Sequence, residues 1–206
     1  MHISWLGQTC VKLQIKNTKD EDVIVLIDAY KPDTGDFPRS FSGNIALYSK
    51  GVEGAVTISQ TPLAVSGPGE VEVKEVMVYA LPGDEGNVIF KINAENMNVV
   101  HLGKITKNIP EEKLEGIGHV DILLLPVGGK GIYLDPEDAN KIVTALEPRI
   151  VIPVGYQCDT DPKVGSLSDF IKEIGLKPDA PEKKLIIKKR DLPAEEMKLI
   201  VLEKNY

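Results

Sequence analysis

The side chains best suited to catalysis or metal binding are scattered along the chain. The three histidines, His2, His101 and His119, show neither His-x-His nor His-x-x-x-His spacing. Zinc sites in proteins usually draw histidine nitrogens, together with thiolates or carboxylates, from closely spaced motifs. Spacing alone therefore gives little support for a metal site, and we expect His2 and His119 to be solvated or to cap a strand.

Two polar residues stand at the ends of predicted strands, where layered folds place their sites. Asp28 follows Val23–Ile27, a continuous apolar run that predicts a central strand, and His101 follows Val99 and Val100. Both are candidate catalytic residues, and His101 is also a candidate metal ligand. The alternatives are structural: Asp28 would cap the following loop by accepting backbone N–H groups, and His101 would close a strand.

The two cysteines predict no disulfide framework and no cysteine nucleophile. Cys10 has an apolar neighbour in Val11, which favours a buried structural thiol. Cys158 lies in the acidic stretch 157–161, which is typical of a surface loop. Such sparing use of cysteine favours a reducing, cytoplasmic setting.

The hydrophobic pattern predicts strands first and then an alternation of strands and helices. Strands are predicted at Ile3–Leu6, Val11–Ile15, Val23–Ile27, Ile45–Tyr48, Val71–Val73, Val76–Leu81, Val88–Ile92, Val99–Val100, Asp121–Leu125, Ile150–Pro153, Leu185–Ile187 and Leu199–Val201. Helices are predicted from Pro110, over Asp135–Leu146 and over Ser166–Ile174, while residues 31–44 are predicted as a loop. This order favours an α+β fold in which helices pack outside two sheets, within one domain spanning residues 1–206.

The composition argues against nucleic acid and membranes as partners. The 206-residue chain has a formal net charge of −7, which gives no support for binding nucleic acid. It has no apolar run long enough to span a membrane, and its N-terminus does not resemble a signal peptide.

Several segments, in order and over essentially the whole chain, resemble the metallo-β-lactamase superfamily. They are Ile3–Cys10 with Val25–Asp28, Ser66–Val73, Asp121–Gly129, Glu147–Val154 and Leu185–Pro193. The closer resemblance is to the small bacterial beta-lactamase-like hydrolases, which are related to the ascorbate-phosphate lactonases. It implies a four-layer αββα sandwich with a di-metal cleft at one sheet edge. In that family, zinc activates a bound water as the nucleophile.

The chain departs from this family at its metal-ligand motifs. The family has His-x-His-x-Asp-His after a strand that ends in a small hydroxyl residue, here Ala46–Ser49. By position, these ligands are replaced by Lys50, Val52, Gly54 and Ala55. The remaining ligand positions, taken from three other motifs, are occupied by Gly83, Lys104 and Gly155. Lys104 replaces the bridging carboxylate that follows His-Leu-Gly in the family.

The changed motifs predict a pseudoenzyme, a catalytically inactive member with a binding, scaffolding or regulatory role, no metal and no other cofactor. Its partner is then an unknown protein or a second copy. A first alternative is a hydrolase with a rebuilt site, using one metal with His101 and the carboxylates Asp28, Glu53 or Asp84. Without a metal, Lys50 or Lys104 would serve as acid, base or anion clamp. A second alternative is a module that binds an anion or small molecule in the vacated cleft.

Overall fold

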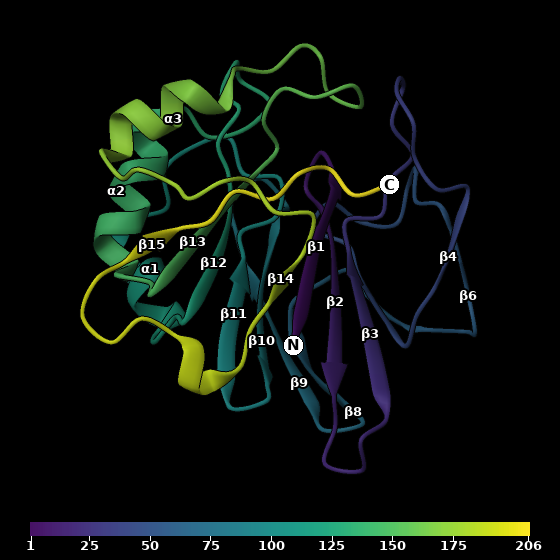
Figure 1. Ribbon diagram of the computed structural model, residues 1–206. Coiled ribbons are helices and arrows are strands. Elements are labelled where there is room, and N and C mark those ends of the chain that lie inside the picture. Colours follow the sequence, from purple (N-terminus) through teal and green to yellow (C-terminus); the bar gives the residue numbers. More distant parts are fainter.

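The computed structural model describes all 206 residues, and two β-sheets packed against each other dominate it (Figure 1). The first sheet has the order β14 (Leu185–Ile186), β1 (His2–Gly7), β2 (Cys10–Lys16), β3 (Asp22–Ile27), β5 (Ile45–Leu47) and β7 (Leu63–Val65). The second has the order β15 (Lys198–Leu199), β13 (Ile150–Val154), β12 (Ile122–Pro126), β11 (Met97–His101), β10 (Val88–Ala94), β9 (Val76–Pro82) and β8 (Gly69–Val73).

The main core lies between the two sheets and follows from the side-chain alternation of the strands. Val11, Leu13 and Ile15 of β2 are buried, while Lys12 and Gln14 between them are only partly covered. A strand points successive side chains to opposite faces, so this period of two turns one apolar face inward. These residues belong to a cluster of 49 buried residues drawn from both sheets and from the helices.

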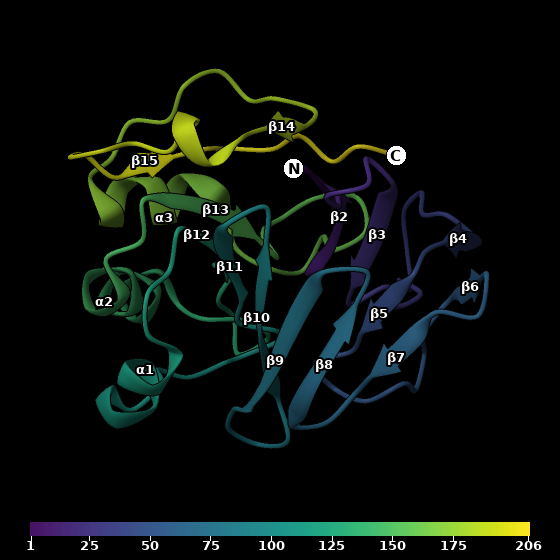
Figure 2. The ribbon, with the colours of Figure 1, turned by 90° about the horizontal axis from the view of Figure 1, so that it is seen from below.

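All three helices pack outside the second sheet, on the side that Figure 2 shows at the left. They are α1 (Glu111–Ile117), α2 (Pro136–Leu146) and α3 (Leu167–Ile174), and they connect or follow the parallel strands β11, β12 and β13. Each buries an apolar face, through Leu114, Ile142 and Phe170 among others. No helix in the structure is both long and apolar enough to cross a membrane.

The outer face of the first sheet is covered by a β-ribbon. This ribbon pairs β4 (Ser40–Ser42) with β6 (Thr57–Ser59), and its Phe41 and Ile58 pack on a small buried cluster around Leu26 and Cys10. The predicted loop at residues 31–44 therefore contains a short strand, and the sequence did not predict β6 or β7. These strands of three residues are too short for a periodic pattern to be recognised. The α+β sandwich itself is confirmed.

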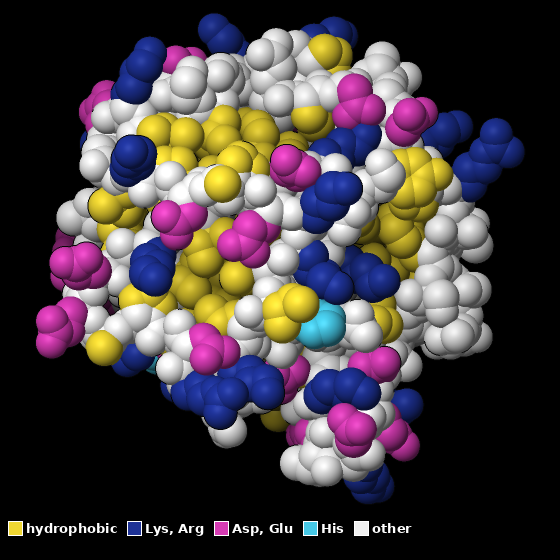
Figure 3. Space-filling view, viewed as in Figure 1, with side chains coloured by type: hydrophobic (Ala, Val, Ile, Leu, Met, Phe, Trp, Pro, Cys, Tyr) yellow, Lys and Arg dark blue, Asp and Glu magenta, His cyan; other side chains and the backbone are white.

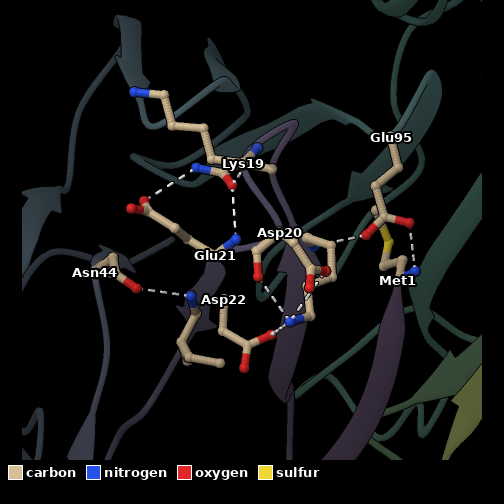
Figure 4. Close-up of polar contacts among 10 residues, drawn as sticks. Met1, Lys19, Asp20, Glu21, Asp22, Asn44 and Glu95 are labelled. Atoms are coloured by element: carbon tan, nitrogen blue, oxygen red, sulfur yellow. Dashed lines mark hydrogen bonds and ion pairs between the residues drawn. The ribbon is translucent and has the colours of Figure 1, made fainter.

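Glu95, in the turn between β10 and β11, ties the two sheets together at one end of the sandwich (Figure 4). One carboxylate oxygen accepts from the N-terminal amine of Met1, at 2.5 Å, and the other accepts from the backbone N–H of Lys16, at 2.9 Å. The adjoining β2–β3 hairpin carries Lys19 and Glu21. This end lies one strand length away from Asp28, which follows the other end of β3.

The face of the molecule seen in Figure 3 carries basic and acidic side chains interspersed with exposed apolar atoms. No broad region of one charge sign is visible on it. Charge alone therefore marks no binding surface on this face.

We predict that Leu13→Ala lowers the free energy of unfolding by about 2–5 kcal/mol, because it leaves a cavity in the core between the sheets. The matched control is Leu63→Ala on β7, where the leucine is 42% exposed and the change costs much less. Urea denaturation measures both. Equal losses for the two variants would contradict this placement of the core.

Candidate functional site

Three loops meet where β3, β5 and β11 end. The parallel strands β3 and β5 pair Ile27 with Leu47, so the residues that follow each strand emerge at the same sheet edge. Hydrogen bonds then join the loops: Asp28 N–H donates to the carbonyl of Leu47, and Lys104 N–H donates to the side-chain Oγ of Ser49 at 3.2 Å. Asp28, Ser49 and Lys104 are thereby brought together at this edge, although they come from separate motifs. Lys104 also lines a small cavity there, which we call the cleft.

Asp28 is 1% exposed and uses both carboxylate oxygens for internal hydrogen bonds. Oδ2 accepts from Thr9 Oγ1 at 2.9 Å and from Ser49 Oγ at 2.7 Å, while Oδ1 accepts from Ser49 N–H at 2.7 Å. Its φ of +52° is one that aspartate tolerates better than most residues. Asp28 therefore joins the β1–β2 turn to the ends of β3 and β5. Its one backbone donor is Ser49, so it caps the end of β5 and not, as considered from the sequence, the loop that follows Asp28.

His101 is completely buried, and both of its ring nitrogens are engaged. Nε2 lies 2.9 Å from the carbonyl of Thr9, and Nδ1 accepts from Gly103 N–H at 2.9 Å. A carbonyl can only accept, so the ring is the Nε2–H tautomer and its single lone pair is used by Gly103. Burial is the largest effect on its pKa and lowers it, which keeps the ring neutral near pH 7. In this arrangement His101 has no free lone pair for a metal.

Lys104 is partly buried where it lines the cleft. The ammonium lies 4.2 Å from the centroid of the Tyr30 ring, at a distance suited to a cation–π interaction, and it forms no ion pair. Desolvation by burial is the main influence on the Lys104 pKa and lowers it, although the charges of Asp28 and Asp161 act in the opposite direction. The backbone N–H also donates to Asn87 Oδ1 at 2.9 Å, which holds the loop in place.

Lys50 lines the same small cavity as Lys104, with a volume of about 20 Å³. Lys50 Nζ donates to the carbonyl of Glu85 at 2.9 Å, and its backbone N–H donates to the Tyr30 hydroxyl at 2.9 Å. The cavity is also lined by Asp84, Glu85, Ile105, Thr106, Lys107 and Ile109. The structure thus places the lysines of two separate motifs beside one opening.

The other ligand positions offer no donor atoms. Val52 is 58% exposed, and a side chain added at Gly54 would meet open space. Ala55 forms a backbone bridge to Tyr30. Gly83 packs against Asn87, and Gly155, with a φ of +61°, packs against the ring of Tyr133.

The sequence did not predict a buried hydrogen-bonded pair beside the cleft, Tyr133 and Asp161. Tyr133 Oη donates to Asp161 Oδ2 at 2.7 Å, and both side chains are buried. Burial raises the pKa of Asp161, and the Tyr133 hydrogen bond and the charge of Lys104 only partly offset this. The predicted surface loop at residues 157–161 is buried at Thr160 and Asp161. No spacing rule links residues 133 and 161, so the sequence carried no signal for the pair.

The described fold and cleft correspond to a known family. Residues 2–155 match the family described as "Beta-lactamase superfamily domain". The chain belongs to the β-lactamase superfamily. The resemblance and the fold expected from the sequence are confirmed.

Two curated relatives in the superfamily are named UPF0173 metal-dependent hydrolases. The protein of Lysinibacillus sphaericus is 32% identical over 98 residues, a match that spans 45% of this chain and only 40% of that relative. The protein of Methanopyrus kandleri is 22% identical over 223 residues, covering 85% of this chain and 94% of its own length.

Solved structures share the superfamily fold. A putative zinc-dependent hydrolase of the metallo-β-lactamase superfamily from Thermotoga maritima has a TM-score of 0.80 and 22% identity, and the match covers 98% of both chains. The metallo-hydrolase Igni18 of Ignicoccus hospitalis has a TM-score of 0.60 and 15% identity, over 84% of this chain and 90% of its own.

The prediction that the chain takes no cofactor is contradicted by these comparisons. The curated relatives are named metal-dependent hydrolases, and a superfamily-fold structure from Streptomyces venezuelae is a diiron β-hydroxylase, so the comparisons point to metal ions. The residues of this chain do not fit such a group as they stand: the structure brings no three His, Cys, Asp or Glu side chains together as a metal-ligand set. Lys104 instead places a cation in the cleft, and like charges repel.

We predict that Asp28→Ala lowers the free energy of unfolding by about 2–4 kcal/mol, because three buried donors lose a charged acceptor. Chemical denaturation at neutral pH measures the loss. Asp28→Asn keeps one carbonyl acceptor and falls between Asp28→Ala and the wild type. Asp33→Ala, at an exposed position of the following loop, is the control, and an equal loss there would contradict the capping role.

We predict that Asp161→Asn becomes more stable relative to the wild type as the pH rises. The folded state raises the Asp161 pKa, so ionising this carboxyl is costlier when folded than when unfolded. The wild type therefore loses stability relative to the variant as the pH climbs from the unfolded pKa to the folded pKa, and the difference is constant above that. Unfolding curves at about pH 3.5 and about pH 7 test this, because the Asp161 carboxyl is mostly protonated in both the folded and the unfolded state at the lower pH. A difference independent of pH would contradict it.

Proposed function

We propose that this chain binds a small anion in the cleft, as a ligand-binding and catalytically inactive member of its superfamily. One observation carries the proposal: Lys104 holds an ammonium without an ion pair at the cavity that Lys50 also lines. A partly buried cation that lacks a carboxylate partner favours an anionic ligand, because the ligand would supply the missing charge.

The charges around the cavity also support an anion. The acids on its wall are already compensated: Glu85 pairs with Lys107 at 2.7 Å, and Asp84 pairs with Lys113 at 2.5 Å. Lys50 donates to a backbone carbonyl, which carries no formal charge. After this compensation, Lys50 and Lys104 remain as the charged lining residues that form no ion pair.

The size of the cavity limits the ligand. A space of about 20 Å³ has room for a water molecule or a similarly small group. A carboxylate or one edge of a phosphate would fit such a space, either as a small anion or as the end of a larger molecule. Lys50 and Lys104 would bind it through charge-assisted hydrogen bonds.

The names of the relatives support a second candidate, metal-dependent hydrolysis at a rebuilt site. The residues considered for it have other partners: Asp28 and His101 are held by internal hydrogen bonds, and Asp84 is paired with Lys113. Glu53 is exposed. We derive no reaction step for this candidate.

We predict that oxalate and inorganic phosphate raise the melting temperature of the protein, because a ligand that binds only the folded state stabilises it by mass action. Lys104→Met and Lys50→Met each weaken binding by about tenfold or more, as expected for the loss of a hydrogen bond from a charged donor. Isothermal titration calorimetry at fixed ionic strength provides the dissociation constants. Lys19→Met, at the opposite end of β3, removes the same charge and leaves binding unchanged.

Elemental analysis of untagged protein, with and without added zinc or manganese, separates the two candidates. Anion binding that is equal in metal-free and metal-loaded protein and lost in Lys104→Met supports the proposed function. Stoichiometric metal together with turnover of a phosphoester or lactone would overturn it in favour of the hydrolase.

A further inference from the structure

We propose that the protein has a second ligand site, a groove beside the β4–β6 ribbon that binds a small organic phosphate carrying a flat apolar group. The groove lies between residues 31–39 and residues 54–57 and has a volume of about 670 Å³. We call it the ribbon groove. It shares no lining residue with the cleft, so the inference goes beyond the proposed function and does not rest on it.

The size and position of the ribbon groove suit a small organic ligand. Ligand pockets in proteins commonly enclose about 300–1,000 Å³. The groove starts at the base of the ribbon, where Arg39 precedes β4 and Thr57 opens β6. The ribbon itself lies on the side of the molecule away from the three helices (Figure 2). Because this site is a groove and not an enclosed cavity, a ligand can enter it without a change of fold.

Hydrogen bonds and close packing hold the walls of the ribbon groove in place. Thr34 Oγ1 donates to the carbonyl of Asp159 at 3.0 Å, which fastens one wall to a distant loop. Gly35 lies so close to that loop that a Cβ added there would be 2.6 Å from the Asp159 carbonyl oxygen. Lys31 N–H donates to the carbonyl of Gly54 at 2.8 Å and so joins one wall to the other. Walls that are already ordered lower the cost of binding.

The charges that line the ribbon groove favour an anion. Lys31 and Arg39 line it, both are exposed, and neither forms an ion pair. The acids of the same loops, Asp33, Asp36 and Glu53, are not among the lining residues. A guanidinium offers a fork of N–H donors that matches phosphate oxygens, and an ammonium adds a point charge. An acid-free lining with both cations therefore suits a phosphate group better than a cation or a neutral polar group.

The remainder of the lining supplies an apolar surface. Four half-buried apolar residues contribute to it, namely Pro32, Phe37, Pro38 and Val56. The Phe37 ring packs edge-to-face with the ring of Phe41, with centroids 5.7 Å apart and an interplanar angle of 79°. This packing holds the Phe37 ring, and aromatic side chains make favourable contacts with other flat rings. A ligand that joins a phosphate to a flat apolar group would use both parts of the lining.

The test compares phenylphosphonate, which has both parts and no ester bond to hydrolyse, with methylphosphonate, which has the charge without the ring. Isothermal titration calorimetry at fixed ionic strength is carried out on Lys104→Met protein, so that binding at the cleft does not contribute. We expect about one equivalent of phenylphosphonate to bind, at least about threefold more tightly than methylphosphonate, as expected for one aromatic contact.

Variants of the lining separate the two parts of the ligand. Lys31→Met and Arg39→Met, each made in the Lys104→Met protein, weaken the binding of both phosphonates by about threefold, and the two changes together by about tenfold, as expected for exposed ion pairs. Phe37→Leu keeps an apolar side chain beneath the ribbon and weakens the binding of phenylphosphonate alone. Lys19→Met, in the β2–β3 hairpin, removes the same charge as Lys31→Met and leaves binding unchanged. Circular dichroism checks that each variant is folded.

Two results would overturn the inference. If phenylphosphonate does not bind, or binds equally well after Lys31 and Arg39 are both replaced, the ribbon groove is not an anion site. If both phosphonates bind equally and Phe37→Leu has no effect, the ligand class with a flat apolar group is wrong. Neither result bears on the cleft, because oxalate binding and its loss in Lys104→Met test the proposed function separately.

Discussion

The carboxylate of Asp28 is the group on which the geometry of the cleft depends. By accepting from Thr9 and twice from Ser49, it fastens the β1–β2 turn and the end of β5 to the end of β3. Ser49 Oγ in turn lies within reach of the backbone N–H of Lys104, so the network extends across to the second sheet. A buried charge is tolerated only when its hydrogen-bonding capacity is used, and here the donors are supplied by the loops themselves. The position of Lys104 thus follows from how one buried carboxylate is satisfied.

A second constraint is the charge that this network leaves in the cleft. All of the donors to Asp28 are neutral groups, so its negative charge remains available to act on Lys104 over a longer range. Tyr30 contributes from the other side, through its ring face to Lys104 and its hydroxyl to the backbone of Lys50. Interactions with partly buried charges are screened less than those at the surface. The cleft is therefore organised around a nitrogen cation, and the proposed binding of an anion rests on this charge.

The sequence predicted the parts of the fold that carry a clear hydrophobic pattern. The strand at Val23–Ile27 was recognisable as a continuous apolar run, and the helix beginning after Asp135 was recognisable from apolar residues at helical spacing. The short ribbon of β4 and β6 was not, since its burial depends on packing against the first sheet. The pair of Lys50 and Lys104 was suggested only by the family resemblance, and Tyr133 with Asp161 had no local signal at all. Contacts between distant loops are determined by tertiary structure, which periodicity does not report.

The core also explains how a hydrolase fold can accommodate such different cleft residues. The buried cluster lies between the sheets and under the helices, while Val52 and Gly54 lie in exposed loops that contribute nothing to it. Loops outside the core tolerate substitution at little cost to stability. Where a changed residue does line the cleft, as Lys104 does, the ring face of Tyr30 and the charges of Asp28 and Asp161 only partly offset its burial. Membership of the superfamily therefore accounts for the scaffold, and the chemistry of the cleft has to be judged from the side chains that line it.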